Sequence, residues 1–229
     1  MAAALMLPNS PFKLSHNHRL SSSSAATHNQ RLLPLRASPQ QESPLEAVLP
    51  EQNEGIKKSV KVLKDAAKTR KVGSEEVLAA LSVIEKAKLD PSEFLQTLGG
   101  TESPGRTWML VFTANAGLKS GGYFPVTAVQ RFDADAMRIE NGVYLGPLGC
   151  LTFEGRFSWK KRILAFIFEN IRIKIGPLGP LQIGLGNDKD REPGTKDPFF
   201  IWFYIDQEIA VARGRGGGTA FWCRCRRVS

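Results

Sequence analysis

The chain has 229 residues, with 31 Lys and Arg against 22 Asp and Glu, a formal net charge of +9. No stretch approaches the roughly 18–20 consecutive apolar residues of a membrane-spanning helix. Three cysteines leave at least one unpaired within the chain, so they do not form a disulfide scaffold. Composition therefore gives no support to a membrane span or a disulfide-rich fold.

The first 37 residues have the composition of an organellar import signal. They contain no Asp or Glu, four Lys or Arg, and a run of serines over Ser21–Ser24. Such acid-poor, Ser-rich segments are typical of transit peptides, whereas Ala2–Leu7 is too short an apolar stretch for a secretory signal. The early Ala and Ser residues and the absence of Arg before Arg19 favour a plastid over a mitochondrion. We predict a chloroplast transit peptide over residues 1–37; a merely disordered N-terminus is the alternative.

Without this segment the excess of basic residues falls from nine to five, and every histidine is lost. Histidine is the commonest general base and the commonest metal ligand in enzymes. We therefore predict a protein that is not an enzyme and that holds no cofactor and no metal. The three cysteines are interpreted as small buried hydrophobic residues. A redox role for Cys223 and Cys225 stays open, and an enzyme with Cys225 as nucleophile is a remote alternative.

Three zones follow the transit peptide. Residues 38–53 are rich in Pro, Gln and Glu and are predicted to be a disordered linker. Residues 54–100 show the three-to-four spacing of amphipathic helices. A first helix is predicted to end at Gly73, a second to be capped by Ser74, and a third to start at Asp90–Glu93. From residue 101 to residue 229 the apolar residues alternate with period two.

The C-terminal zone is predicted to be an antiparallel sheet. Leu151–Lys160 alternates apolar and polar residues, as a half-buried strand does, and turn residues separate it from the other runs. The other predicted runs are Trp108–Thr113, Val126–Phe132, Arg138–Leu145, Arg162–Phe168, Ile171–Ile175, Leu181–Leu185, Phe199–Ile205, Ile209–Arg213 and Thr219–Arg224. Short strands without helical crossovers predict a barrel or a sandwich. A barrel of about eight strands can hold one small apolar ligand.

The run Phe199–Ile205 is apolar at odd and even positions alike. A strand with one face in water alternates, so the second face of this one must meet the N-terminal helices, a partner or a lipid surface. Packing against the helices is the simplest of the three. Gly214–Gly218 joins two predicted strands, so it is interpreted as a hairpin turn and not as a phosphate-binding loop.

Polar residues near the C-terminus give two further hypotheses. Asp206 follows an apolar strand and is either a hairpin-turn residue or a polar anchor paired with Arg213. On the last strand, Trp222, Arg224 and Arg226 alternate with apolar residues and share one face. That combination suits an anionic membrane surface or a nucleic acid, with a solvated strand face as the alternative.

Several segments together resemble the plastid lipid-associated protein (fibrillin) family. Gly105–Thr113 (GRTWMLVFT) is similar to the opening of that domain, and Tyr204–Asp206 followed by Ala212–Gly214 and Gly217–Phe221 is similar to its close. The segments that resemble its middle are Val129–Asp133, Arg138–Val143, Leu151–Phe157 and Ile173–Leu178. The chain departs from the pattern at Glu208–Val211 and at Cys223–Arg227, and so resembles a divergent member.

The resemblance implies a mainly β protein with N-terminal helices (α+β). Its antiparallel, lipocalin-like β-barrel would be preceded by two to three amphipathic helices. It also implies a plastid protein that is peripheral to thylakoids or plastoglobules and stores, transports or scaffolds apolar lipids such as prenylquinones, carotenoids or fatty acids.

We therefore predict a non-enzymatic lipid-binding barrel. Five residues on inward strand faces are expected to line its pocket: Phe153, Phe157, Ile173, Phe203 and Phe221. Asp206 and Arg213 are expected to orient a polar head, and Trp222, Arg224 and Arg226 to rest on the membrane. No transmembrane span is expected, and nucleic acid is an improbable partner. The alternative is a basic β-barrel that binds RNA or a photosynthetic-complex assembly partner through Arg215 and Arg224–Arg227. An interior filled by its own aromatic residues would change the pocket into a scaffold.

Overall fold

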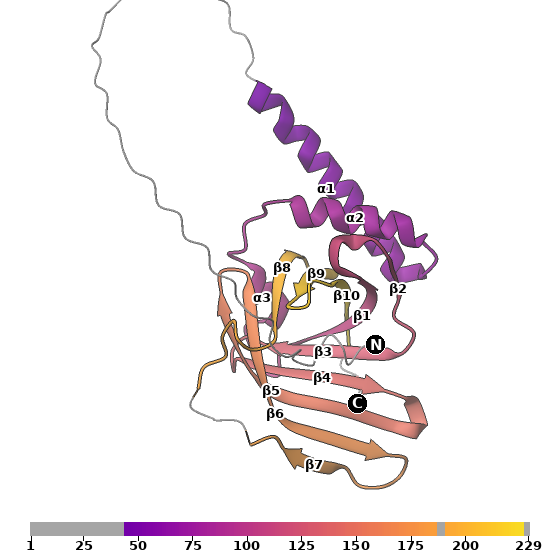
Figure 1. The fold of residues 1–229 in the computed structure, drawn as a ribbon, viewed down its shortest axis with the longest axis vertical. Coiled ribbons are helices and arrows are strands. Elements are labelled where there is room, and N and C mark those ends of the chain that lie inside the picture. Colours follow the sequence, from indigo (N-terminus) through magenta and orange to yellow (C-terminus); the bar gives the residue numbers. More distant parts are fainter. Residues whose placement is uncertain (1–43, 187–190, 227–229) are drawn as a thin grey trace, which may run out of the picture.

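The structure is a computed structural model that describes residues 44–186 and 191–226. The predicted transit peptide and the first part of the predicted linker lie outside the described residues. Within the described ranges, no helix is both long and apolar enough to cross a membrane. The described chain is an antiparallel barrel with three helices ahead of it in sequence (Figure 1).

The helices are α1 (Pro44–Thr69), α2 (Ser74–Lys86) and α3 (Phe94–Gly99). Helix α1 begins ten residues before the predicted boundary at Glu54, so the linker prediction is wrong from Pro44 onward. Proline is tolerated there because the first residues of a helix have no helical partner for their N–H groups. At the start of α2, Gly73 holds the cap position and Ser74 is already helical, so the predicted serine cap is also wrong.

Ten strands follow, and every predicted strand run overlaps one of them, with at most one residue beyond the end of the strand. The strands are β1 (Arg106–Ala114), β2 (Gly121–Tyr123), β3 (Thr127–Asp133), β4 (Arg138–Tyr144), β5 (Gly149–Lys160), β6 (Ile163–Ile175), β7 (Leu181–Gly184), β8 (Phe199–Ile205), β9 (Ile209–Gly214) and β10 (Thr219–Cys225). Two predicted runs are the two halves of β6. Strand β2 lies where the sequence predicted a turn at Gly121-Gly122. Two short 3₁₀ turns, η2 (Ala116–Leu118) and η3 (Gly146–Leu148), lie in the connections.

Eight of these strands close into a barrel in the order β10-β9-β8-β6-β5-β4-β3-β1, because β10 also pairs with β1. All the pairings are antiparallel. Strand β2 adds to β1 and β7 adds to β6, outside the closed ring. The structure thus confirms the predicted helix-preceded antiparallel β-barrel and excludes the sandwich.

Three bulges set which side chains face inward. Glu169 is an extra residue in β6, because Glu154 pairs with Asn170 while Gly155 pairs with Phe168. Similar register shifts occur in β1 after Leu110 and in β8 after Trp202. An extra residue reverses the alternation of faces beyond it.

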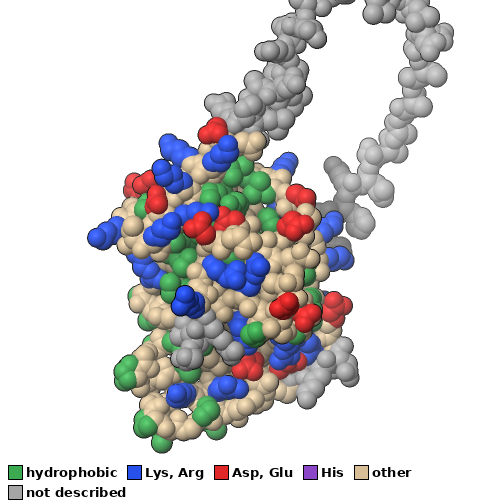
Figure 2. Space-filling view, turned by 180° about the vertical axis from the view of Figure 1, so that it is seen from behind, with side chains coloured by type: hydrophobic (Ala, Val, Ile, Leu, Met, Phe, Trp, Pro, Cys, Tyr) green, Lys and Arg blue, Asp and Glu red, His purple; other side chains and the backbone are tan. Residues whose placement is uncertain are grey.

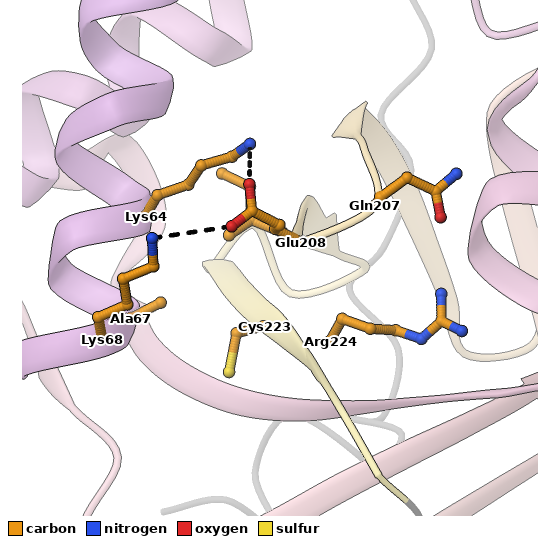
Figure 3. Close-up of a pocket in the computed structure, with 8 residues that line it drawn as sticks. Lys64, Ala67, Lys68, Gln207, Glu208, Cys223 and Arg224 are labelled. Atoms are coloured by element: carbon orange, nitrogen blue, oxygen red, sulfur yellow. Dashed lines mark ion pairs between the residues drawn. The ribbon is translucent and has the colours of Figure 1, made fainter.

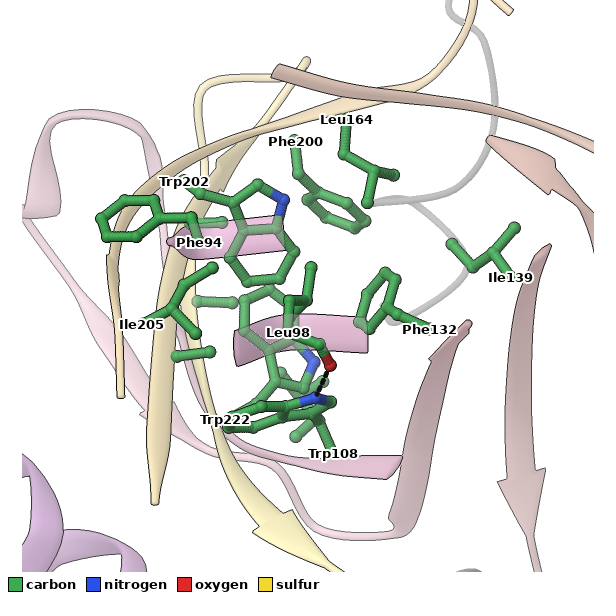
Figure 4. Close-up of a cluster of buried hydrophobic side chains, with 14 of the residues drawn as sticks. Phe94, Leu98, Trp108, Phe132, Ile139, Leu164, Phe200, Trp202, Ile205 and Trp222 are labelled. Atoms are coloured by element: carbon green, nitrogen blue, oxygen red, sulfur yellow. Dashed lines mark hydrogen bonds between the residues drawn. The ribbon is translucent and has the colours of Figure 1, made fainter. Parts of the chain in front are cut away.

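Apolar residues form two clusters on opposite sides of the β1 and β8–β10 part of the barrel wall. The first is inside the barrel and is rich in aromatic rings: Trp108, Phe132, Phe157, Phe166, Phe200, Trp202 and Trp222 (Figure 4). The second lies outside, where α1 and α2 cover the wall, and includes Leu63, Leu81, Phe112, Phe203 and Phe221. The second apolar face of Phe199–Ile205 is thus buried against the helices, the simplest of the three predicted explanations.

Helix α3 covers the end of the barrel at which β1 begins and β3 and β8 end. Phe94 and Leu98 enter the interior cluster. The indole N–H of Trp108 donates to the Leu98 carbonyl oxygen at 2.7 Å, and the Arg106 guanidinium donates to the Thr97 carbonyl oxygen at 2.8 Å. This end is closed by a helix and packed with rings.

Replacing Trp108 with Phe tests this closure. The variant leaves the buried Leu98 carbonyl without its donor, so we expect the free energy of unfolding to fall by about 1–3 kcal/mol. Urea titration followed by far-ultraviolet circular dichroism measures it. The control is Trp159→Phe, at a half-buried indole. Equal losses in the two variants would contradict the role given to this hydrogen bond.

Candidate ligand cavity of the barrel

The other end of the barrel interior contains a cavity of about 440 Å³. Its lining is almost wholly apolar and comes from β1, β3–β6, β8–β10 and the residue after β7. The apolar residues of the lining are Leu110, Ala128, Val129, Val143, Leu151, Phe153, Phe168, Ile171, Leu185, Phe200, Ala212, Ala220 and Trp222. The volume falls within the roughly 300–1,000 Å³ of small-molecule sites in proteins. The barrel is thus packed with rings at one end and hollow at the other.

The buried polar atoms of this lining include one acceptor and one donor without a hydrogen-bond partner. They are Oε1 of Gln130, a residue 6% exposed, and Nε1 of Trp222, a residue 2% exposed. Gln130 on β3 pairs with Trp108, and Trp222 on β10 pairs with Leu110. The two residues therefore lie on opposite sides of β1, offset by two residues along that strand. Buried polar groups are almost always bonded, so a partnerless acceptor and donor in one cavity call for an explanation.

Three of the five predicted pocket residues lie on the inner face of the barrel. Phe153 lines the cavity and contacts the ring of Phe168, with the two centroids 5.4 Å apart. Phe157 is 3% exposed, but it packs with Phe132 in the ring cluster, outside the cavity lining. Ile173 pairs directly with the cavity residue Leu151, so it continues the same inner face toward the open end.

The other two predicted pocket residues, Phe203 and Phe221, do not line the cavity. Both belong to the outer cluster beneath α1 and α2. Phe203 is the residue at the register shift of β8, and Phe221 pairs with Val211 on the helix-covered face. Alternation alone showed that β10 has two faces, but not that Phe221 lies on the outer one.

The predicted pairing of Asp206 with Arg213 is also wrong, because each residue binds a different helix. Asp206 binds Lys64 of α1 at 2.8 Å and accepts hydrogen bonds from the backbone N–H groups of Glu208 and Ile209. It is therefore the hairpin-turn aspartate of the alternative interpretation. The Arg213 guanidinium binds Glu85 of α2 and lies 5.1 Å from the centroid of the Phe203 ring. Neither residue faces the cavity.

The predicted membrane-facing residues of β10 do not form an exposed face, because the first of them, Trp222, is buried. Trp222 and Arg224 share a face as predicted, but that face is the barrel interior, where Trp222 is buried. The Arg224 guanidinium lies 5.5 Å from the centroid of the Trp108 ring, near the closed end. Of the three residues only Arg226 is exposed.

Cys223 and Cys225 are not activated thiols. Burial raises the pKa of Cys223, and burial together with the neighbouring Cys223 raises the pKa of Cys225 to about 11. A protonated thiol is a poor nucleophile, so the geometry lends no support to the Cys225 alternative. Among the described residues, no group of three or more His, Cys, Asp or Glu side chains is placed to hold a metal ion.

A second hollow of about 370 Å³ lies between α1 and the ends of β9 and β10 (Figure 3). Its cations are largely neutralised, since Lys64 binds both Asp206 and Glu208 and Lys68 lies 3.8 Å from Glu208. Burial disfavours the charge on Lys64, but hydrogen bonds from this residue to Asp206 and Glu208 outweigh that effect and raise its pKa. Burial likewise opposes ionisation of Asp206, and its bonds from Lys64 and the turn N–H groups outweigh it and lower its pKa. This cluster attaches α1 to the barrel.

The comparisons with known proteins leave the function open. No protein-family model matches the chain, and no curated protein matches it. Among solved structures, it is similar to the NMR structure of a protein from Burkholderia xenovorans. The two are 12% identical over 62% of this chain and 92% of the other, with a TM-score of 0.34. The cavity is therefore interpreted from its own residues.

Replacing Lys64 with Met tests the attachment of α1. The lowered pKa of Asp206 contributes stability above its ordinary value of 3.8, and this contribution is lost as the pH falls through the lowered value. The raised pKa of Lys64 contributes stability below 10.5, which is lost as the pH rises through the raised value. We therefore expect the stability difference between the original chain and the variant to be largest between about pH 4 and pH 10.

Urea unfolding across this pH range measures the difference. Lys61→Met, at an exposed position of the same helix, is the control and should change stability little at any pH. A stability difference for Lys64→Met that does not change with pH would contradict the ion-pair interpretation.

Proposed function

We propose that the barrel binds one apolar molecule in its cavity, as a non-enzymatic lipid-binding protein. The observation that supports this most strongly is the cavity of about 440 Å³ with its apolar lining. Burial of an acyl or isoprenoid chain in such a site supplies about 0.8 kcal/mol per methylene before the costs of ordering. A scaffold with a barrel filled by its own side chains has no such space.

Gln130 Oε1 and Trp222 Nε1, which lack hydrogen-bond partners, indicate which polar group the ligand carries. A hydroxyl group can both accept a hydrogen bond, as Trp222 Nε1 requires, and donate one, as Gln130 Oε1 requires, and a protonated carboxyl group can do the same. A quinone carbonyl or a carboxylate only accepts, and a carotene hydrocarbon does neither. We therefore favour a long apolar molecule with a hydroxyl or carboxylic acid end.

The cellular setting of this proposal is a plastid. It comes from the composition of residues 1–37 and from the likeness of Gly105–Thr113 and the other segments to the plastid lipid-associated protein (fibrillin) family. A peripheral position at thylakoids or plastoglobules, with apolar lipid as ligand, belongs to the same proposal. The proposal includes no metal and no other cofactor.

The positions of Arg215 and Arg224 do not support the RNA-binding alternative. Arg215 precedes β10 and donates to the Lys196 carbonyl oxygen, while Arg224 lies at the other end of that strand beside Trp108. A seven-residue strand is roughly 20 Å long, so the two do not form one phosphate-binding patch. A steep loss of RNA affinity with salt would nevertheless revive this alternative.

A cavity-filling variant tests ligand binding. Ala128 lines the cavity on β3, and Ala128→Phe places a ring in the space that a ligand would fill. We expect delipidated Ala128→Phe protein to lose saturable binding to a panel of fatty alcohols, fatty acids, quinones and carotenoids, measured by quenching of tryptophan fluorescence. The control Thr127→Phe adds the same ring at the neighbouring, outward position. An original chain that binds no member of the panel would contradict the proposal.

A second variant tests the polar end of the ligand. Gln130→Leu removes the acceptor that lacks a partner and puts an apolar side chain of similar size in its place. We expect its affinity for a fatty alcohol to fall about tenfold, because the hydroxyl loses a buried hydrogen bond. Its affinity for an alkane of equal length should be unchanged or higher. A uniform loss for both ligands would indicate distortion of the cavity instead.

A further inference from the structure

The outer halves of β4–β7 and their two turns, residues 143–151 and 171–185, extend beyond the closed part of the barrel (Figure 1). We call this four-stranded extension the tongue. Residues paired directly across antiparallel strands share a face. Val143 pairs with Leu151, Leu151 pairs with Ile173, and Ile173 pairs with Leu181. The inner face of the tongue is therefore a continuous apolar sheet, while Arg172, Lys174 and Gln182 lie on its outer face.

The tongue holds almost every large exposed hydrophobic residue among those described. Leu148 is 74% exposed and Leu178 is 65% exposed, as is Ile175, and the two leucines each lie in a turn bounded by Gly and Pro. The others on the tongue are Leu145, Leu181, Ile183 and Leu185. The one such residue elsewhere is Val83 on α2, at 38%. So many exposed apolar side chains at one end of a protein mark an interaction site.

The cavity reaches the surface at this face. Leu185 both lines the cavity and is 40% exposed, whereas α3 and the ring cluster close the opposite end. A ligand that enters or leaves the cavity at this end therefore passes the apolar face of the tongue.

The chemistry around this face fits lipid. In residues 141–151 and 173–186 the sequence contains one charged residue, Lys174, and no Asp or Glu. Figure 2 shows hydrophobic and basic side chains together at the lower end of the molecule. Exposed leucines beside a cation suit the interface of a bilayer that contains anionic lipid. An acidic or strongly polar protein surface would leave these leucines without apolar contacts.

We propose that the tongue docks on an anionic lipid surface, with the turns at Leu148 and Leu178 inserted among the headgroups and the cavity mouth facing the lipid. In this placement the ligand passes between bilayer and cavity without crossing water. This use of the surface rests on the proposed lipid-binding function, but the docking itself is a separate property.

The backbone limits the depth of insertion. Among the described strands β7 pairs only with β6, so its other edge carries backbone N–H and C=O groups without a strand partner. Such groups are costly in hydrocarbon, so the tongue stays at the interface and inserts side chains only.

Vesicle sedimentation tests the docking, with the full chain in every sample so that residues 1–43 are common to all. Vesicles of phosphatidylcholine mixed with phosphatidylglycerol are compared with phosphatidylcholine alone. We expect the double variant Leu148→Ser and Leu178→Ser to bind the mixed vesicles at least about tenfold more weakly, because two exposed leucines no longer enter the interface. Lys174→Gln should weaken binding to the mixed vesicles only. Val83→Ser, an exposed apolar residue on α2, is the control and should bind as the original chain does.

Three results would overturn the docking proposal: no sedimentation of the original chain, equal sedimentation of the double variant, or an equal loss in Val83→Ser. A dimer of the original chain that ignores vesicles and dissociates in the double variant would show a contact between two copies at this face. Fluorescence quenching by a fatty alcohol in solution separates the two proposals. Retained quenching in a double variant that no longer sediments supports docking. Absence of quenching in an original chain that does sediment contradicts only the ligand-binding proposal.

Discussion

Strand β10 pairs with β9 along one edge and with β1 along the other, and the second pairing closes the sheet. Closure removes the free edges of the outermost strands of the ring and separates an inside from an outside. On β8, β9 and β10 both sides are then apolar, because rings fill the inside and α1 and α2 cover the outside. The ion pairs from Lys64 to Asp206 and from Arg213 to Glu85 attach the helices at the edges of that contact. Helices α1 and α2 therefore form an outer layer that the apolar outside of β8–β10 requires.

The interior is filled unevenly, and this asymmetry gives the barrel a direction. Large rings such as Trp108 and Trp202 occupy the end under α3, whereas small residues, Ala128, Ala212 and Ala220, leave space at the other end. Partnerless buried polar atoms occur in both parts, since Trp202 Nε1 in the ring cluster also has no partner. Trp108 Nε1 has a backbone partner in α3, while Trp222 Nε1, one step closer to the opening, has none. The end filled with side chains is structural, and the hollow end is where a ligand is expected.

The sequence predicted the strands well because alternation and turn residues are local signals. It could not assign the faces of β8 and β10, because both sides of these strands are apolar and bulges reverse the alternation. Phe203 and Phe221 were therefore placed inside although they pack against the helices. The partners of Asp206 and Arg213 come from α1 and α2, more than a hundred residues away along the chain, so no local pattern could name them. Gln130 sits in an ordinary alternating run, and only its burial beside an empty space distinguishes it.

The extra residue in β6 has a consequence for the chemistry of the open end. Glu169 projects outward, where it binds Arg156 of the adjacent strand β5 and Arg138 of β4, one strand further on. Beyond it, Ile171, Ile173 and Ile175 face inward and Arg172 and Lys174 face outward. Had β6 continued in register from Phe168, the two cations would point toward the cavity and the isoleucines toward water. Whether apolar or basic side chains line the opening thus depends on the one extra residue in β6. Deleting one residue between Phe168 and Ile171 would therefore exchange the apolar and basic faces at this entrance.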